Sequence, residues 1–133
     1  MRPLSSSPPQ SVINQLQSIG DRVTRQDWLT GIVITYEPLW AVGPDALKVA
    51  SPVQAQDMHA EIRKWVSMSI GTEAANAVRI IYGGSINKGN CEKMAKQKDI
   101  DGFMLGSASL RPTEFCEIIN LSAVCKFGEA IGM

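Results

Sequence analysis

The chain has 133 residues, of which 44% are hydrophobic, and its 13 lysines and arginines balance 13 acidic residues to give a formal net charge of zero. This length and composition suit one modest globular domain with a buried core, and the lack of a positive field excludes a strongly basic protein that binds nucleic acid. No apolar run approaches the ~20 residues needed to span a bilayer, so a membrane protein is excluded as well.

The first ten residues have the sequence MRPLSSSPPQ, which is rich in serine and proline and predicts a disordered leader over 1–10. This segment lacks the apolar stretch of a secretory signal. The cysteines, Cys91, Cys116 and Cys125, form no CxxC motif, so the sequence supports neither a disulfide framework nor a zinc site. Reduced thiols are typical of a cytoplasmic protein, and we expect that location.

The predicted elements alternate between helices and short apolar strands. Helices are indicated by apolar residues three and four positions apart, and strands by continuous apolar runs that suit a sheet buried on both faces. Ser51 and Pro52 form a strong helix start, because serine caps a first turn and proline suits the first helical position. The elements expected in chain order are a helix over 12–20, a strand over 32–34, a helix over 52–70, a strand over 78–82, a helix over 88–97, a strand over 103–105 and a helix from 112 onwards. A helix followed by three strand–loop–helix units predicts an α/β fold with parallel strands and right-handed crossovers.

Each predicted strand ends in residues suited to chemistry, at the sheet edge where α/β folds place ligands. The first strand leads into YEPLWAVG at 36–43, where Glu37 stands at the mouth of an apolar strand and a poorly solvated carboxylate is a stronger base. The second strand leads into YGGS at 82–85 and the third into GSASL at 106–110. Both loops offer hydroxyl groups, and their glycines have no side chain to shield the backbone N–H groups. Such donors suit an anion such as phosphate.

Together the three motifs resemble the triosephosphate isomerase family, in the family's order and approximate spacing, over about 15–120. The resemblance implies a partial TIM (β/α)8 barrel, with about three consecutive parallel β/α units preceded by a helix. A closed barrel of this kind needs roughly 250 residues, so residues 11–120 would correspond to its C-terminal half. Residues 121–133 run past the family's usual end and are expected to form a C-terminal extension.

The resemblance also implies an activity and a set of site residues. Glu37 would be the base that moves a proton between C1 and C2 as dihydroxyacetone phosphate and glyceraldehyde 3-phosphate interconvert, a step of glycolysis and gluconeogenesis that uses no metal or organic cofactor. The residues implied to bind the substrate phosphate are Gly43, Ser85, Gly106 and Ser107. The residues implied to form the lid hinge and latch are Pro38, Trp40, Lys48, Val49, Ala50 and Tyr82. Arg63 and Asp99 match a structural ion pair of the family.

The chain departs from the family pattern in what it lacks and in its lid. No residues correspond to the family's first four strands, which supply a substrate-binding asparagine and lysine, an electrophilic histidine and most of the interface of the homodimer. The single histidine, His59, falls in the helix after the lid, and we expect it at the surface or in a groove rather than in catalysis. The lid tip, 43–48, holds two extra residues and a proline. The chain alone is therefore expected to be weakly active or inactive, and to need a complementary N-terminal half or self-association.

A second hypothesis from another class is a non-catalytic half-barrel that acts as a phosphate-binding or assembly module. Three parallel strands leave exposed edges, and unpaired edges favour association with a partner chain or a second copy. The altered lid and the extended tail agree with this alternative. Phosphate binding without turnover would separate it from the isomerase hypothesis.

Overall fold

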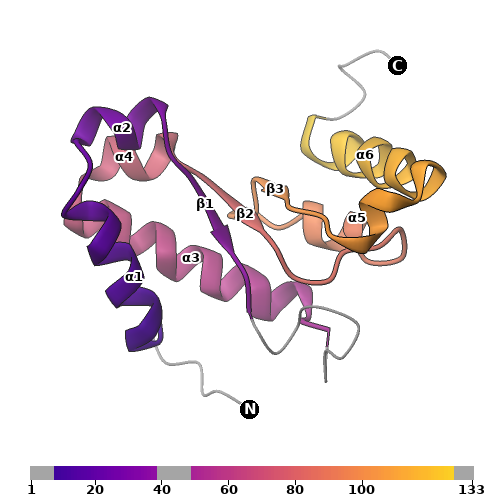
Figure 1. Cartoon of the computed structure of the whole chain (residues 1–133), viewed down its shortest axis with the longest axis horizontal. Helices are drawn as coiled ribbons and strands as arrows, with labels where there is room; N and C mark the ends of the chain where they lie inside the picture. Colours follow the sequence, from indigo (N-terminus) through magenta and orange to yellow (C-terminus); the bar gives the residue numbers. More distant parts are fainter. Residues whose placement is uncertain (1–7, 39–48, 128–133) are drawn as a thin grey trace.

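The structure, a computed structural model, describes residues 8–38 and 49–127 and has an α/β fold (Figure 1). Its sheet holds three parallel strands in the order β1-β2-β3, formed by Val33–Tyr36, Arg79–Tyr82 and Gly102–Phe103. The helices are α1 (Gln10–Gly20), α2 (Arg25–Thr30), α3 (Pro52–Ser69), α4 (Thr72–Ala77), α5 (Cys91–Ala95), α6 (Pro112–Phe127) and the short 3₁₀ helix η2 (Ser107–Leu110). The predicted class and the parallel strand arrangement are confirmed.

Local capping explains where two of the helices begin. Ser51 Oγ accepts a hydrogen bond from Gln54 N at 3.1 Å, and Gln54 Oε1 accepts one from Ser51 N at 2.9 Å. This reciprocal pair satisfies two backbone donors that a helix start otherwise leaves free. Thr24 and Asp27 form the same capping box before α2. Their spacing is a recognisable helix start, although α2 is not among the elements predicted from the sequence.

Several boundaries differ from the predicted ones. The helix expected over 88–97 is limited to α5, because Asn87 Oδ1 accepts hydrogen bonds from Gly89 N at 2.8 Å and Asn90 N at 3.0 Å and holds that stretch in a turn. The helix α4 was not predicted, and Gly71, with a φ of 139° that favours glycine, separates it from α3. The helix α6 runs without a break across residue 120, where the C-terminal extension was expected to begin.

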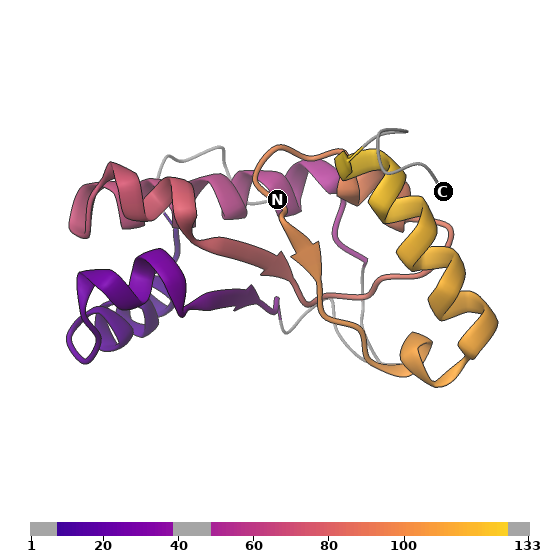
Figure 2. The same ribbon diagram turned by 90° about the horizontal axis from the view of Figure 1, so that it is seen from above.

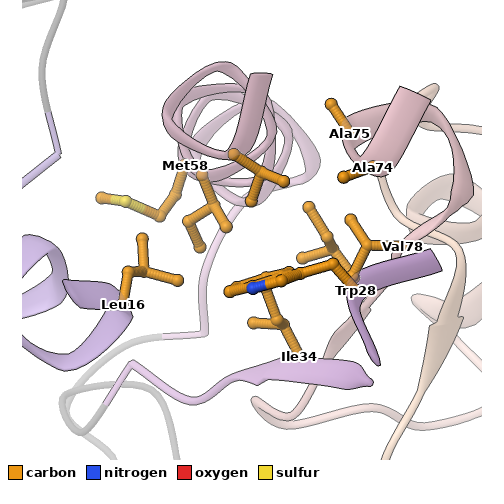
Figure 3. Close-up of a cluster of buried hydrophobic side chains, with 10 residues drawn as sticks. Leu16, Trp28, Ile34, Met58, Ala74, Ala75 and Val78 are labelled. Atoms are coloured by element: carbon orange, nitrogen blue, oxygen red, sulfur yellow. The ribbon is translucent and has the colours of Figure 1, made fainter. Parts of the chain in front are cut away.

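One face of the sheet is covered by helices and carries the core. Because side chains alternate along a strand, Ile34, Ile80 and Tyr82 point to this face, and all three are buried. A first cluster lies between β1, β2 and the helices α1 to α4, and its residues are Leu16, Trp28, Ile34, Met58, Ile62, Val66, Ala74, Ala75, Val78 and Ile80. Figure 3 shows the Trp28 ring lying across Ile34 of β1. A second cluster joins the end of β2 to α5 and α6 (Figure 1).

The other face of the sheet is open within the described part of the chain. Figure 2 looks onto the three strands with no helix in front of them. We call this the open face, and the alternation of the strands and their ends assigns to it Val33, Thr35, Glu37, Arg79, Ile81, Gly83, Gly102 and Met104. Val33 is 51% exposed and Met104 is 40% exposed. Parallel sheets are almost always buried on both faces, so this exposure of apolar side chains is unusual.

Candidate active site

The parallel pairing brings the three predicted motifs to one edge of the sheet. Tyr36 pairs with Tyr82, and Tyr82 pairs with Phe103, so the residues that follow each strand lie side by side. The pairing continues past the strand ends, because Gly83 N donates to Tyr36 O at 2.8 Å and Met104 N donates to Tyr82 O at 3.0 Å. Glu37 and the two glycine-containing loops therefore start from adjacent positions.

Glu37 leans over the adjacent Gly83. A Cβ atom added at Gly83 would lie 2.7 Å from Glu37 Cγ and 2.8 Å from Thr35 Cγ2, so the absence of a side chain there makes room for the glutamate stem. The Glu37 side chain is exposed to solvent. The expectation of a poorly solvated carboxylate is wrong for this chain, because Glu37 belongs to the open face and no described residue covers that face.

Tyr82 is buried beneath the loop that follows β2. Its ring lies so close to Gly84 that a Cβ atom added there would overlap the Tyr82 hydroxyl. The hydroxyl has no hydrogen-bond partner among the described residues. Burial, with a smaller contribution from the neighbouring Tyr36, raises the pKa of Tyr82 to about 12, so the phenol stays protonated and able to donate.

Hydrogen bonds hold the backbone of both loops expected to bind phosphate. Asn90 Nδ2 donates to Ser85 O at 2.9 Å, which fixes the backbone of the loop after β2. Ser109 donates to Gly106 O through both its backbone N, at 3.0 Å, and its Oγ, at 2.6 Å. Gly106 and Ser107 are exposed, and a Cβ atom added at Gly106 would meet no atom within 4 Å. The space around this backbone is therefore open to a ligand.

The residues expected to form the lid are only partly described. Pro38 is buried directly after Glu37, and Val49 is exposed. Ala50 is buried in the second cluster together with Tyr82, so the structure brings together two residues expected in the hinge and latch. Three further residues expected in the site, Gly43, Trp40 and Lys48, lie outside the described residues. The latch role of Tyr82 stays a prediction.

Comparison with known proteins gives the chain a family. The family model described as triosephosphate isomerase matches residues 6–122. The chain belongs to the triosephosphate isomerase family. It is 49% identical over 106 residues to a chloroplastic triosephosphate isomerase of Secale cereale, covering 80% of the chain and 34% of the relative. It is also 45% identical over 120 residues to a cytosolic one of Oryza sativa subsp. japonica, covering 90% of the chain and 45% of the relative.

The match to these triosephosphate isomerases is partial in length. A third relative, from Aspergillus oryzae, is 47% identical over 109 residues, and 42% of it is covered. The chain therefore spans between a third and a half of the length of the relatives that it matches. No helix in the described part of the chain is both long enough and apolar enough to cross a membrane.

The ion pair that the triosephosphate isomerase resemblance implies is present and belongs to a larger network. Arg63 Nε donates to Asp99 Oδ1 at 2.8 Å, and Arg63 Nη2 donates to Asp101 Oδ2 at 2.6 Å. Arg63 Nη1 donates to two backbone carbonyl oxygens, of Ala75 at 2.6 Å and of Val78 at 3.0 Å. One guanidinium group therefore connects α3, the end of α4 and the segment that enters β3.

His59 is buried, which corrects the expectation of a surface or groove position. Its ring has no exposed surface and lies against two tyrosines, with ring centroids 5.8 Å from Tyr36 and 6.0 Å from Tyr82. His59 Nδ1 donates to Asp99 O at 3.0 Å, whereas Nε2 has no hydrogen-bond partner among the described residues. Burial lowers the pKa of His59, an effect that exceeds the opposing hydrogen bond to Asp99, so the neutral ring is favoured.

This burial predicts a pH dependence of stability. The pKa of His59 in the folded chain lies below the ordinary 6.5, so the unfolded chain binds the extra proton first. We expect the free energy of unfolding to be insensitive to His59 above pH 6.5 and to fall below it, by up to about 1.4 kcal/mol per pH unit. Urea unfolding at pH 7.5 and 5.5 measures the loss, and a His59→Asn variant, which keeps a donor near Nδ1, should lose less. An equal loss in both proteins would contradict the assignment.

Proposed function

We propose that the chain supplies the base and the phosphate-binding loops of a triosephosphate isomerase site, on about three β/α units of a partial TIM barrel. Glu37 removes a proton from C1 of dihydroxyacetone phosphate and returns it at C2 to form glyceraldehyde 3-phosphate, a reaction of glycolysis and gluconeogenesis. The phosphate is held by the backbone of Gly43, Gly106 and Ser107 and by Ser85. The position of Glu37 beside the two glycine loops, at one sheet edge, is the observation that carries this proposal.

The residues of this chain supply only part of the chemistry that the isomerase reaction needs. Glu37 is exposed, so a substrate carbon can approach its carboxylate, and Gly106 leaves its surroundings open to an anion. Proton removal beside a carbonyl also needs a group that stabilises the negative charge that develops on the oxygen. His59 does not meet this need, because its ring is buried among aromatic side chains in the sheet's covered layer. We therefore assign the missing electrophile to a complementary N-terminal half.

Complementation tests the proposal directly. The full chain alone is expected to show little or no isomerase turnover, and turnover is expected to appear when it is mixed with the portion of the Oryza sativa relative that precedes the matched region. Glu37→Gln should then lower turnover by about 10²–10⁴-fold, because a general base contributes about that much. Glu61→Gln, the same change on α3, is the matched control and should leave turnover unaltered. High activity of the chain alone that Glu37→Gln abolishes would contradict the need for a second half.

A non-catalytic role remains the second candidate, and the open face favours it. Phosphate bound by the Gly106 loop needs neither the second half of a barrel nor Glu37. Titration calorimetry of the chain with inorganic phosphate, combined with the complementation assay, distinguishes the two functions. Binding that Glu37→Gln leaves intact, with no turnover in any mixture, would support the module.

A cytoplasmic location also stays a prediction, since relatives named chloroplastic and cytosolic both match.

A further inference from the structure

Side-chain hydrogen bonds connect the loop after β2 to the start of α5. Asn90 Nδ2 donates to Ser85 O at 2.9 Å, and Asn90 Oδ1 accepts from Asn87 N at 2.8 Å. Asn90 is the residue directly before α5, and its backbone oxygen accepts the helical hydrogen bond from Met94 N at 3.1 Å. One amide side chain therefore bonds the loop backbone at two points, while its own backbone is held by the helix.

Asn87 shapes the turn that places Asn90. Its Oδ1 accepts hydrogen bonds from Gly89 N at 2.8 Å and from Asn90 N at 3.0 Å, and its backbone oxygen accepts one from Cys91 N at 3.0 Å. Asparagine favours such a turn, because its short side chain reaches backbone N–H groups two and three residues further on. Asn87 is exposed, whereas the bond from Asn90 to Ser85 is partly buried.

Packing beneath the loop holds both ends of this connection. Ile86, directly after Ser85, and Cys91, the first residue of α5, are both buried. Both belong to the second cluster, which also contains Ala108 of the other loop expected to bind phosphate. The peptide group between Ser85 and Ile86 is planar, so a bond to its oxygen and burial of the next side chain together fix its orientation.

We propose that Asn90 is a positioning residue for the phosphate group: its amide holds the Ser85 backbone in the orientation that binds the anion. This inference rests on the proposed function, in which Ser85 is one of the phosphate-binding residues. Asn90 acts through Ser85 and does not contact the substrate. A loop that is ordered before the ligand arrives loses less conformational freedom on binding, so the Asn90 amide favours binding of the phosphate rather than proton transfer by Glu37.

Two aspartate substitutions separate the hydrogen bond from the charge. Asn90→Asp keeps the oxygen that accepts from Asn87 N, but it places an oxygen without a hydrogen opposite Ser85 O, and two acceptors do not bond. Asn87→Asp is the matched variant, because both hydrogen bonds of the Asn87 side chain within the described residues use its oxygen, which aspartate retains. Each substitution adds one negative charge to the same turn, so a difference between them reports the lost donor.

The first measurement needs no ligand. Backbone NMR relaxation of the full chain gives order parameters for the amides of Gly84, Ser85 and Ile86. In the parent chain and in Asn87→Asp these should lie near the rigid value of about 0.85, whereas in Asn90→Asp those of Ser85 and Ile86 should fall below about 0.6. Order parameters that Asn90→Asp leaves unchanged would overturn the proposal.

The second measurement is phosphate affinity. Titration calorimetry with inorganic phosphate should give a dissociation constant about tenfold higher for Asn90→Asp, the effect of one lost hydrogen bond. In the complemented mixture KM should rise by about the same factor while kcat stays within about twofold, because the phosphate is bound in the ground state and the transition state alike. Asn87→Asp should leave the dissociation constant and KM within about threefold of the parent values. Equal weakening by both variants would show an effect of charge alone and contradict the positioning role.

Circular dichroism checks that each variant is folded. If Asn90→Asp unfolds the chain, Asn90→Ala replaces it, removes the same donor without adding charge, and should also raise the dissociation constant by about tenfold. An Asn90 variant that binds phosphate as tightly as the parent chain would overturn the positioning role and leave the proposed function intact. A parent chain that neither binds phosphate nor turns over substrate in the complemented mixture would overturn the proposed function, and the positioning role with it.

Discussion

Replacing Arg63 with methionine is expected to lower the free energy of unfolding by about 3–5 kcal/mol, because it removes one partner from a largely buried set of charges. The side chain of Arg63 is 19% exposed and that of Asp99 is 13% exposed. Without the guanidinium group, the Asp99 carboxylate and the carbonyl oxygens of Ala75 and Val78 lose a donor while they stay largely shielded from water. The total free energy of unfolding of a small domain is only about 5–15 kcal/mol, so the urea concentration at the midpoint of unfolding should fall markedly.

The matched control for this change is Arg25→Met. Arg25 forms an ion pair with Glu73 at the same 2.8 Å distance, but the side chains are 58% and 66% exposed. Exposed pairs contribute little, so the control should lose no more than about 1 kcal/mol. Equal losses in the two variants would show that burial does not set the strength of the Arg63 network. The loss of stability in an Arg63→Lys variant should lie between those of the two methionine variants, because a lysine ammonium group cannot form all the hydrogen bonds that the planar guanidinium group donates.

Replacing Gly84 with alanine is expected to lower the free energy of unfolding by about 2–3 kcal/mol, at the upper end of what overpacking costs. The added methyl group would overlap the Tyr82 hydroxyl and the ring carbon Cζ that carries it, and the neighbouring ring carbon Cε1 would lie only 2.7 Å away. Tyr82 is buried in the second cluster, so its ring moves only by displacing neighbours. Near-ultraviolet circular dichroism should also report the disturbed tyrosine.

Gly106→Ala is the matched control, since a Cβ atom there meets nothing within 4 Å. We expect this substitution to change stability by less than about 0.5 kcal/mol. A double-mutant cycle identifies the clash: in a Tyr82→Leu background, Gly84→Ala should cost less than about 1 kcal/mol. Losses of the same size at Gly84 and Gly106, or no relief in the Tyr82→Leu background, would rule out this steric explanation.

Much of the fold was predictable because its signals are local. The start of α3 follows from Ser51 and Pro52, and the end of β2 at Tyr82 follows from the two glycines directly after it, whereas β1 and β3 end two residues away from their predicted ends. The alternation of elements is sufficient to predict parallel strands. The short helices α2 and α4 were missed because six residues carry too little apolar periodicity to indicate a helix. For α2, the spacing of Thr24 and Asp27 was the available signal.

The candidate site was only half predictable. The motifs identified Glu37 and the glycine loops, and the sheet register brings their starting positions together. Neither the exposure of Glu37 nor the close contact between Tyr82 and Gly84 follows from neighbouring residues in the chain. Both depend on what lies above and below the sheet, which is a property of the assembled layers.

The family, the order of the strands and of the longer helices, and the residue types at each strand end follow from the amino-acid sequence alone, because these depend on motifs and short-range spacing. The burial of His59 required the folded chain, since its hydrogen-bond partner Asp99 lies forty residues away. The same is true of the four groups that Arg63 bonds, which come from two other segments of the chain, and of the sheet face that has no cover within the described residues. Contacts between residues distant in the chain set burial and charge pairing, and no local pattern encodes them.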